Sequence, residues 1–171
     1  QQGLPIGITP YYLSLCDPHD ASCPVRRQCV PDAREDATVP GDLVDPLGEV
    51  DHEVAPHLVR RYPDRVLLLA TDRCAVYCRF CTRSRIVGDG GGAVPLERLE
   101  IRDVIVSGGD PLAMATDRID RILGRIRAIP TVETIRLATR VPVTLPMRIT
   151  AELVRTLRKH HPVWVMTHFN H

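Results

Sequence analysis

The sequence predicts an α/β fold on a parallel sheet, preceded by a lead-in without regular pattern. Four short runs rich in β-branched and aliphatic residues begin near residues 66, 103, 134 and 163. Amphipathic helical patterns stand between the later runs. Strand starts spaced by roughly 30 residues describe successive βαβ units and hence a parallel sheet. An open doubly wound sheet and a barrel both fit this pattern.

The lead-in, residues 1–65, is rich in Pro, Asp and Arg and shows no sustained hydrophobic period. Short apolar patches such as "YYLSL" alternate with turn signals such as "DPLGE". We therefore expect short helices and loops over 1–65, and the α/β unit over 66–171.

The four expected strands are "RVLLLAT", "DVIVSGG", "TIRLAT" and "VWVMTHF", each of a length suited to burial on both faces. Trp164, in the fourth, is expected in the core or in an interface. Four parallel strands alone would leave an unpaired edge, which favours aggregation.

Two helices are expected between these strands. The first has an apolar stripe at spacings of three and four, formed by Ile119, Ile122, Leu123, Ile126 and Ile129. The second begins after Thr150, a suitable N-cap, and places Leu153, Val154 and Leu157 on one side. Both patterns are typical of helices that lie on a sheet.

Composition excludes several classes of protein. The chain has 171 residues, 44% of them hydrophobic and 25% charged, which is typical of a soluble globular domain. Its net charge of +1 gives no overall attraction to nucleic acid or membrane. No apolar run approaches the roughly 20 residues of a membrane span, and the first residues lack signal-peptide features. We expect a cytoplasmic protein.

Polar or glycine-rich segments follow each expected strand: the loop "DRCAVYCRFCTRSR", then "SGGDP", "ATRVP" and "THFNH". The carboxyl ends of parallel strands lie at one edge, where active sites of such folds are found. We expect all four segments to meet there and form one site.

Three cysteines, Cys74, Cys78 and Cys81, are clustered in the first of these loops. Structural zinc usually has four protein ligands, whereas three cysteines on a 4Fe–4S cluster leave one iron open to another ligand. The spacing favours an iron–sulfur cluster over zinc or no metal. The other cysteines, Cys16, Cys23 and Cys29, lack such spacing and are expected to be buried or surface thiols.

With Tyr77 and Phe80 between them, these cysteines resemble the signature of radical S-adenosylmethionine (SAM) enzymes. More narrowly, the chain resembles the lysine 2,3-aminomutase family, in segment order and over nearly its whole length. The segments are "ITPYYLSL", "DPLGE", "RYPDRVLLL", the cysteine loop, "VSGGDPL", "TRVPVTLPMRIT" and "THFNH". The resemblance implies a partial (β/α) barrel with about four of six βα units.

The resemblance also implies roles for residues. Cys74, Cys78 and Cys81 match the cluster ligands, and Arg83 matches the arginine that binds the substrate carboxylate. A planar bidentate donor suits that task, although a solvated arginine in a basic loop is the plainer alternative. The residues that match SAM contacts are Ser107, Gly108, Gly109, Asp110 and Phe80. His168, Asn170 and His171 are placed for a ligand contact, or for hydrogen bonds that cap a loop.

The implied reaction uses the cluster, SAM and pyridoxal 5′-phosphate. One electron from the cluster splits SAM, and the resulting 5′-deoxyadenosyl radical starts migration of an amino group from carbon 2 to carbon 3. The implied partners are an amino-acid substrate and an electron donor of flavodoxin or ferredoxin type, with a homo-oligomer as a further candidate. Free lysine, glutamate and a protein-bound lysine all remain open as substrates.

Pyridoxal phosphate needs a lysine, and the only lysine here, Lys159, lies near the end of an expected helix. We therefore expect the N-terminal part of a longer or truncated enzyme, which cannot complete the reaction alone. Two alternatives are a zinc-stabilised binding module that grips an anionic partner and a catalytically inactive relative.

Overall fold

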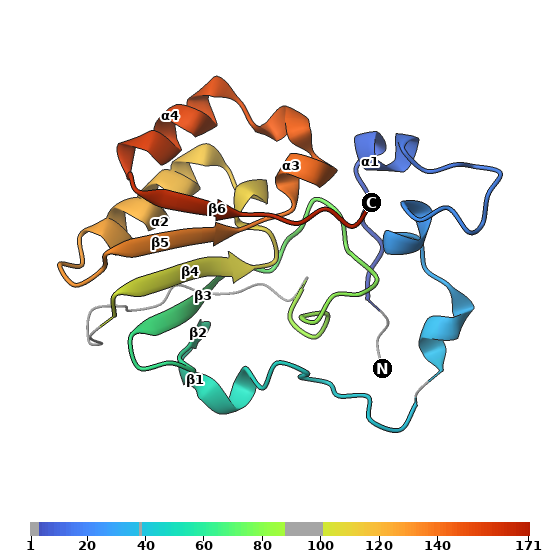
Figure 1. Cartoon of the computed structure of the whole chain (residues 1–171), viewed down its shortest axis with the longest axis horizontal. Helices are drawn as coiled ribbons and strands as arrows, with labels where there is room; N and C mark the ends of the chain where they lie inside the picture. The colour runs from blue at the N-terminus through green and yellow to red at the C-terminus, as the bar shows by residue number, and fades with distance from the viewer. Residues whose placement is uncertain (1–3, 38, 88–100) are drawn as a thin grey trace.

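The computed structural model of the chain describes residues 4–37, 39–87 and 101–171. It is an α/β structure with one six-stranded, mostly parallel sheet (Figure 1). The strands follow one another in the sheet in the order of the sequence: β1 (Glu53–Ala55), β2 (Leu58–Val59), β3 (Arg65–Thr71), β4 (Asp103–Gly108), β5 (Thr134–Ala138) and β6 (Val163–Met166). The predicted strands are therefore β3 to β6, and the α/β class is confirmed.

The four predicted strands run parallel to one another. In β3, β4 and β5, Val66 is in register with Val104, and Val104 with Ile135. All three side chains are buried. At the start of β4, the carboxylate of Asp103 pairs with Arg65 at 2.8 Å and with Arg136 at 2.7 Å. These ion pairs join three adjacent strands at the end of the sheet remote from the cysteine loop.

Two strands were not expected. β1 and β2 form an antiparallel pair, and β2 lies antiparallel to β3. Strands of three and two residues are too short to show an alternating hydrophobic pattern, which explains why the sequence suggested only helices and loops in this region. The turn between them contains His57, whose φ of 65° is unusual for a residue other than glycine.

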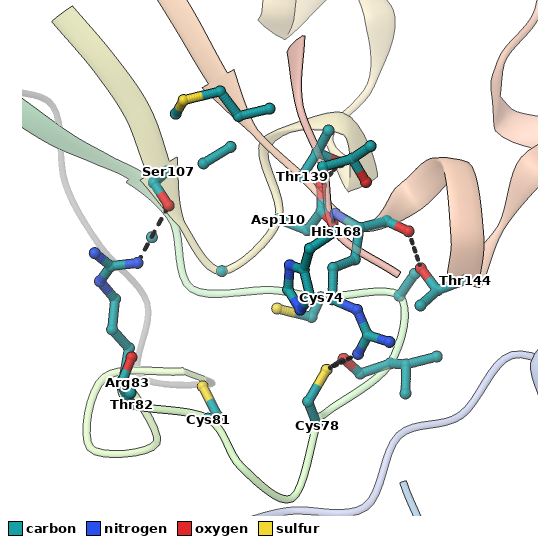
Figure 2. A pocket seen from close by; sticks show the side chains of 18 of the residues that line it. Cys74, Cys78, Cys81, Thr82, Arg83, Ser107, Asp110, Thr139, Thr144 and His168 are labelled. Atoms are coloured by element: carbon teal, nitrogen blue, oxygen red, sulfur yellow. Dashed lines mark hydrogen bonds between the residues drawn. The ribbon is translucent and has the colours of Figure 1, made fainter. Parts of the chain in front are cut away.

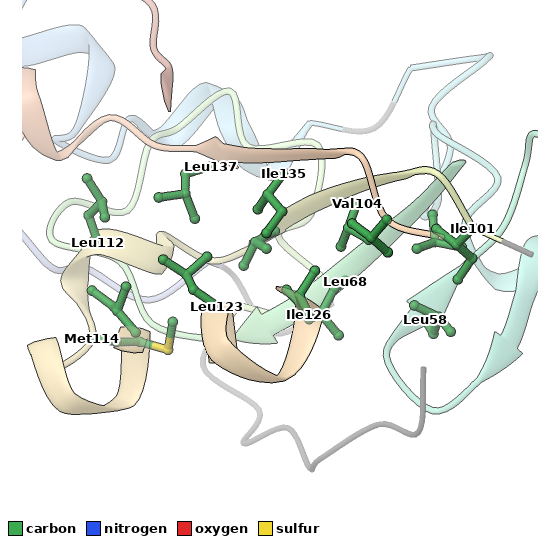
Figure 3. Close-up of a cluster of buried hydrophobic side chains, with 14 of the residues drawn as sticks. Leu58, Leu68, Ile101, Val104, Leu112, Met114, Leu123, Ile126, Ile135 and Leu137 are labelled. Carbon is green, nitrogen blue, oxygen red and sulfur yellow. The ribbon is translucent and has the colours of Figure 1, made fainter. Parts of the chain in front are cut away.

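Both predicted helices are present and pack against each other, as α2 (Thr116–Arg127) and α4 (Ala151–Lys159). The predicted stripe of α2 contributes three fully buried residues to the core: Ile119, Leu123 and Ile126. Figure 3 shows Leu123 and Ile126 between helix and sheet. Thr150 caps α4, because its hydroxyl accepts a hydrogen bond from the Leu153 amide at 3.2 Å. Val154, expected beside Leu153, is instead 38% exposed.

The remaining helices are short. The α-helices α1 (Pro10–Ser14) and α3 (Val141–Thr144) accompany five 3₁₀ turns: η1 (Arg26–Gln28), η2 (Ala33–Asp36), η3 (Val50–His52), η4 (Pro111–Ala113) and η5 (Pro146–Arg148). A second apolar cluster is centred on Tyr12, Cys29 and Val76, and Val143 packs against it. It fixes the lead-in against the cysteine loop and α3.

The sheet is open, so the partial barrel expected from the resemblance is not confirmed. Along the parallel side the outermost strand is β6, where Trp164 is 63% exposed, so this residue is not in the core. Residues 88–100 of the β3–β4 connection lie outside the described part. Within the described residues, no helix is both long and apolar enough to span a membrane.

Candidate active site

A cavity of about 460 Å³ lies at the carboxyl ends of the four parallel strands (Figure 2). Its walls come from all four segments that follow these strands, as the sequence predicted: residues 74–76, 78, 80–83, 107–110, 138–140, 144 and 166–168. The volume lies within the range of small-molecule sites, roughly 300–1,000 Å³. Residues far apart in sequence thus form one site because the strands end at the same edge.

The three cysteines all line this cavity, at separate points of one loop (Figure 2). Burial raises the pKa of the Cys74 thiol, and the nearby Asp110 carboxylate adds to that rise. Burial also raises the pKa of Cys81. Burial thus disfavours the thiolate form of both side chains, while the nearby Arg83 acts in the opposite direction on Cys81.

The thiols do not converge on one point. Among the residues that the structure describes, no three His, Cys, Asp or Glu side chains are grouped closely enough to hold a single metal ion. This arrangement does not favour the zinc-stabilised module. A multi-iron cluster, in which each thiolate binds a different iron, fits three separated thiols on the wall of a cavity.

The Gly-Gly-Asp turn after β4 lies against the start of the cysteine loop. The amide of Gly109 donates to the Thr71 carbonyl at 2.5 Å, and that of Asp110 to the Arg73 carbonyl at 2.8 Å. A Cβ atom on Gly108 would lie 2.2 Å from the Thr71 oxygen, and one on Gly109 would lie 2.4 Å from the Arg73 oxygen. Two glycines are therefore needed for this contact between backbones.

The Asp110 carboxylate is buried and braces the cavity wall. It accepts the Thr139 hydroxyl at 2.6 Å and three backbone amides, those of Leu112, Arg140 and Val141. Burial raises the pKa of Asp110, while these hydrogen bonds act in the opposite direction. The carboxylate thus connects the ends of β4 and β5, which are two of the four strand ends in the site.

Arg83 reaches the cavity from the cysteine loop and is held by a buried carboxylate. Its Nε lies 2.8 Å and its Nη2 2.7 Å from Glu49 Oε1, and its Nη1 donates to the Ser107 hydroxyl at 3.3 Å (Figure 2). Arg85 pairs with the second Glu49 oxygen at 3.2 Å and with Asp45 at 3.0 Å. Asp45 and Glu49, at the ends of "DPLGE", therefore order the basic part of the loop.

Arg140 contacts side chains from several parts of the chain at the site. Its Nη1 lies 2.6 Å from Cys78 Sγ, and its Nη2 donates to Gln28 Oε1 at 2.8 Å and to the Tyr12 hydroxyl at 3.3 Å. The guanidinium also lies over the Phe80 ring, 5.4 Å from its centroid. It thereby joins the end of β5, the cysteine loop and the lead-in.

The C-terminal residues of the predicted site are only partly brought together. His168 lines the cavity, and its ring is 6.4 Å from that of Phe80 in an edge-on arrangement. Asn170 and His171 are exposed and do not line it. Lys159 is paired with Asp120 of α2 at 2.9 Å and does not line the cavity either.

Every other predicted site residue lines this cavity in the structure. The sequence analysis did not single out Arg140 or Glu49, which make the contacts described above. Both stand in segments that carried the resemblance, "TRVPVTLPMRIT" and "DPLGE". Membership of such a segment was the only signal, because an isolated arginine or glutamate has no spacing that marks a function.

A three-cysteine loop that follows one strand of a parallel sheet and faces a Gly-Gly-Asp turn is the arrangement that the resemblance to radical SAM proteins implies. No family model matches the chain. It is 48% identical to the L-lysine 2,3-aminomutase of Clostridium subterminale over 99% of this chain and 44% of that protein. Identity is 47% to the Bacillus subtilis L-lysine 2,3-aminomutase, over 98% of this chain and 38% of that protein.

The glutamate 2,3-aminomutase of Clostridioides difficile is 43% identical over 96% of this chain and 41% of its own length. The chain is thus similar to the N-terminal part of L-lysine 2,3-aminomutases. It spans less than half of the length of these three relatives.

Proposed function

We propose that this chain forms the cluster- and SAM-binding part of a radical SAM 2,3-aminomutase that acts on lysine or a related amino acid. The observation that carries the proposal is the convergence of four strand ends on one cavity lined by Cys74, Cys78 and Cys81. The similarity to aminomutases named for lysine and for glutamate supports an amino-acid substrate. An external electron donor of flavodoxin or ferredoxin type belongs to the same proposal.

Each cavity residue has a proposed task. The three cysteines would hold the cluster, the turn Ser107–Asp110 would border the methionine end of SAM, and Phe80 would lie near its adenine. When bound, the cluster and SAM supply a radical that removes hydrogen from the substrate. Gly108 and Gly109 fix the strand end beside the cluster loop, and Asp110 holds the strand end that bears Arg140. These contacts keep the cavity walls in place.

Arg83 is proposed to bind the substrate carboxylate. Glu49 occupies one side of its guanidinium, so that Nη1 is directed toward Ser107 and the cavity. Because Glu49 already orders the Arg83 guanidinium, less side-chain entropy is lost when a ligand binds to it. His168 is proposed as a further ligand contact, on the evidence of its place in the wall. Asn170 has no such support.

The parallel strands are proposed to be part of a (β/α) barrel, in which further βα units pair with β6. The support is the sequential strand order and the exposed outer strand. Pyridoxal phosphate is proposed for the whole enzyme only, because the single lysine of this chain is engaged on the helical side.

Anaerobic reconstitution with iron and sulfide tests the central proposal. The parent chain and Cys16→Ser, a control outside the cluster loop, should become brown and bind about four irons per chain. Cys78→Ser should lose most of that iron. With SAM and dithionite, the reconstituted parent should form 5′-deoxyadenosine. Colourless protein with one bound zinc would contradict the proposal, and a cluster without SAM cleavage would support an inactive relative.

The same preparation tests Arg83. Arg83→Lys should keep its iron but lose the change in 5′-deoxyadenosine yield that added lysine or glutamate causes in the parent. Arg79→Lys is the control, because Arg79 pairs with Glu35 outside the cavity. An equal response to the amino acid in both variants would exclude Arg83 as its binding residue.

A further inference from the structure

Arg140 carries a positive charge that the described protein groups do not balance. The residue is only 8% exposed, and its Nε is buried without a hydrogen-bond partner. Its other nitrogens contact two neutral oxygens, on Gln28 and Tyr12, and the sulfur of Cys78. Within the described part of the chain, no carboxylate forms an ion pair with this guanidinium.

A buried cation without a counter-charge is costly, so its presence indicates an anion in the site. The group closest to the guanidinium that can be negative is the Cys78 sulfur, at 2.6 Å. A cluster bound by three thiolates is negative overall and becomes more negative when it is reduced. The cation thus stands where the charge of a bound cluster would change.

We propose that Arg140 is a positioning residue for the iron–sulfur cluster. Its guanidinium donates an N–H···S hydrogen bond to the Cys78 ligand and raises the reduction potential of the cluster. Hydrogen bonds to ligand sulfurs and nearby net charge are two of the factors that set cluster potentials. This inference rests on the proposed function, because it requires that the chain binds the cluster.

The geometry explains why arginine stands at this position. The backbone amide of Arg140 is fixed by Asp110 at 2.7 Å, and the guanidinium lies over Phe80. The planar guanidinium then contacts Cys78 through Nη1 and both Gln28 and Tyr12 through Nη2. A lysine has a single compact ammonium and cannot make these contacts together.

The redox step concerned is the transfer of one electron from a low-potential donor to the cluster. The donor is oxidised, the cluster is reduced, and no bond is formed or broken at Arg140. A cation beside Cys78 stabilises the reduced form more than the oxidised form. Removal of the cation is therefore expected to lower the potential.

A redox titration of the reconstituted chain, followed by visible absorbance and electron paramagnetic resonance, tests this role. Arg140→Gln should retain iron, because all three cysteines remain. We expect its equilibrium constant for one-electron reduction to fall about tenfold or more, which corresponds to about 59 mV. Arg148→Gln is the matched control: it removes the same charge at a partly buried arginine that donates to Met114 and Thr116. Its potential should equal that of the parent.

Equal potentials in Arg140→Gln and the parent would overturn the inference. If Arg140→Gln does not fold or does not hold iron, Arg140→Lys decides. The potential of Arg140→Lys should lie below that of the parent, by less than the decrease expected for Arg140→Gln but by more than any change in Arg148→Lys. A potential equal to that of the parent would again overturn the inference. Absence of a cluster from the parent itself would instead refute the proposed function, so the two failures are distinguishable.

Discussion

Gly108 and Gly109 lie where the end of β4 closely approaches the backbone that follows β3. Gly108 has a φ of +106°, which is unfavourable for residues with a Cβ. An added Cβ on either glycine would overlap a carbonyl oxygen, that of Thr71 or of Arg73. Since the overlapped atoms belong to backbone, they cannot move aside as the end of a long side chain can.

Gly108→Ala and Gly109→Ala should each lower the free energy of unfolding by about 1–3 kcal/mol, the usual cost of overpacking. Urea unfolding followed by circular dichroism measures this change.

Gly124→Ala is the control for the two variants. Gly124 lies within α2, and its Cβ would be 3.5 Å from His160, which is ordinary van der Waals contact. Because alanine favours a helix by about 1 kcal/mol over glycine, this variant should be as stable as the parent or more so. Equal stability of Gly108→Ala and the parent would show that the turn relaxes without cost.

At the scale of elements, Asp120 connects α2 to the end of α4. Its carboxylate pairs with Lys159 at 2.9 Å and with His160 at 2.5 Å. The hydrogen bond from Lys159, and then the one from His160, lowers the pKa of Asp120. A carboxyl group whose pKa is lower in the folded state stabilises the fold above its unfolded pKa, and this contribution is lost as the pH falls through the folded value.

Asp120→Asn should therefore be less stable than the parent at pH 6, and the difference should shrink as the pH falls below about 3.9, the ordinary pKa of an aspartate. Urea midpoints of both proteins between pH 6 and pH 2.5 measure it. Asp117→Asn serves as the control, because Asp117 pairs with Arg121 on the exposed side of α2. A difference that stays constant over this range would show that Asp120 does not act through its charge.

The longer elements could be predicted from sequence, and the shorter ones could not. Ile119, Leu123 and Ile126 repeat over enough turns of α2 to define its buried face, and the runs at β3 to β5 are rich in aliphatic residues. β1 and β2 consist of too few residues to show a period, and they form because β3 offers a partner. Val154 is exposed although its neighbour Leu153 is buried, since adjacent helical residues differ by about 100°.

The same limit applies to the candidate site. The cysteine spacing is a local pattern, so Cys74, Cys78 and Cys81 could be located before the structure was known. The tasks of Glu49 and Arg140 depend on contacts with residues at least 34 positions away, at Arg83 and Cys78. No pattern within a short window contains such pairs, which are created by the sheet and by the packing of the lead-in.

For the whole molecule, we expect the exposed edge strand β6 and the residues after it to determine how the chain behaves alone. Trp164 is 63% exposed, Val165 46% and Phe169 70%, beside a strand that pairs with β5 on one side. An apolar strand at the edge of a sheet is a template for pairing with another chain. The chain as given should therefore self-associate through β6.

Sedimentation velocity over a range of concentrations measures this association. Val165→Lys should shift the chain toward the monomer, because a lysine on an edge strand opposes pairing. Val44→Lys is the matched control, since Val44 is 70% exposed in the lead-in and outside the sheet. Association that persists equally in both variants would assign the contact to another surface. Loss of association in Val165→Lys alone would identify β6 as the strand that accepts a further partner, the role proposed for it in a barrel.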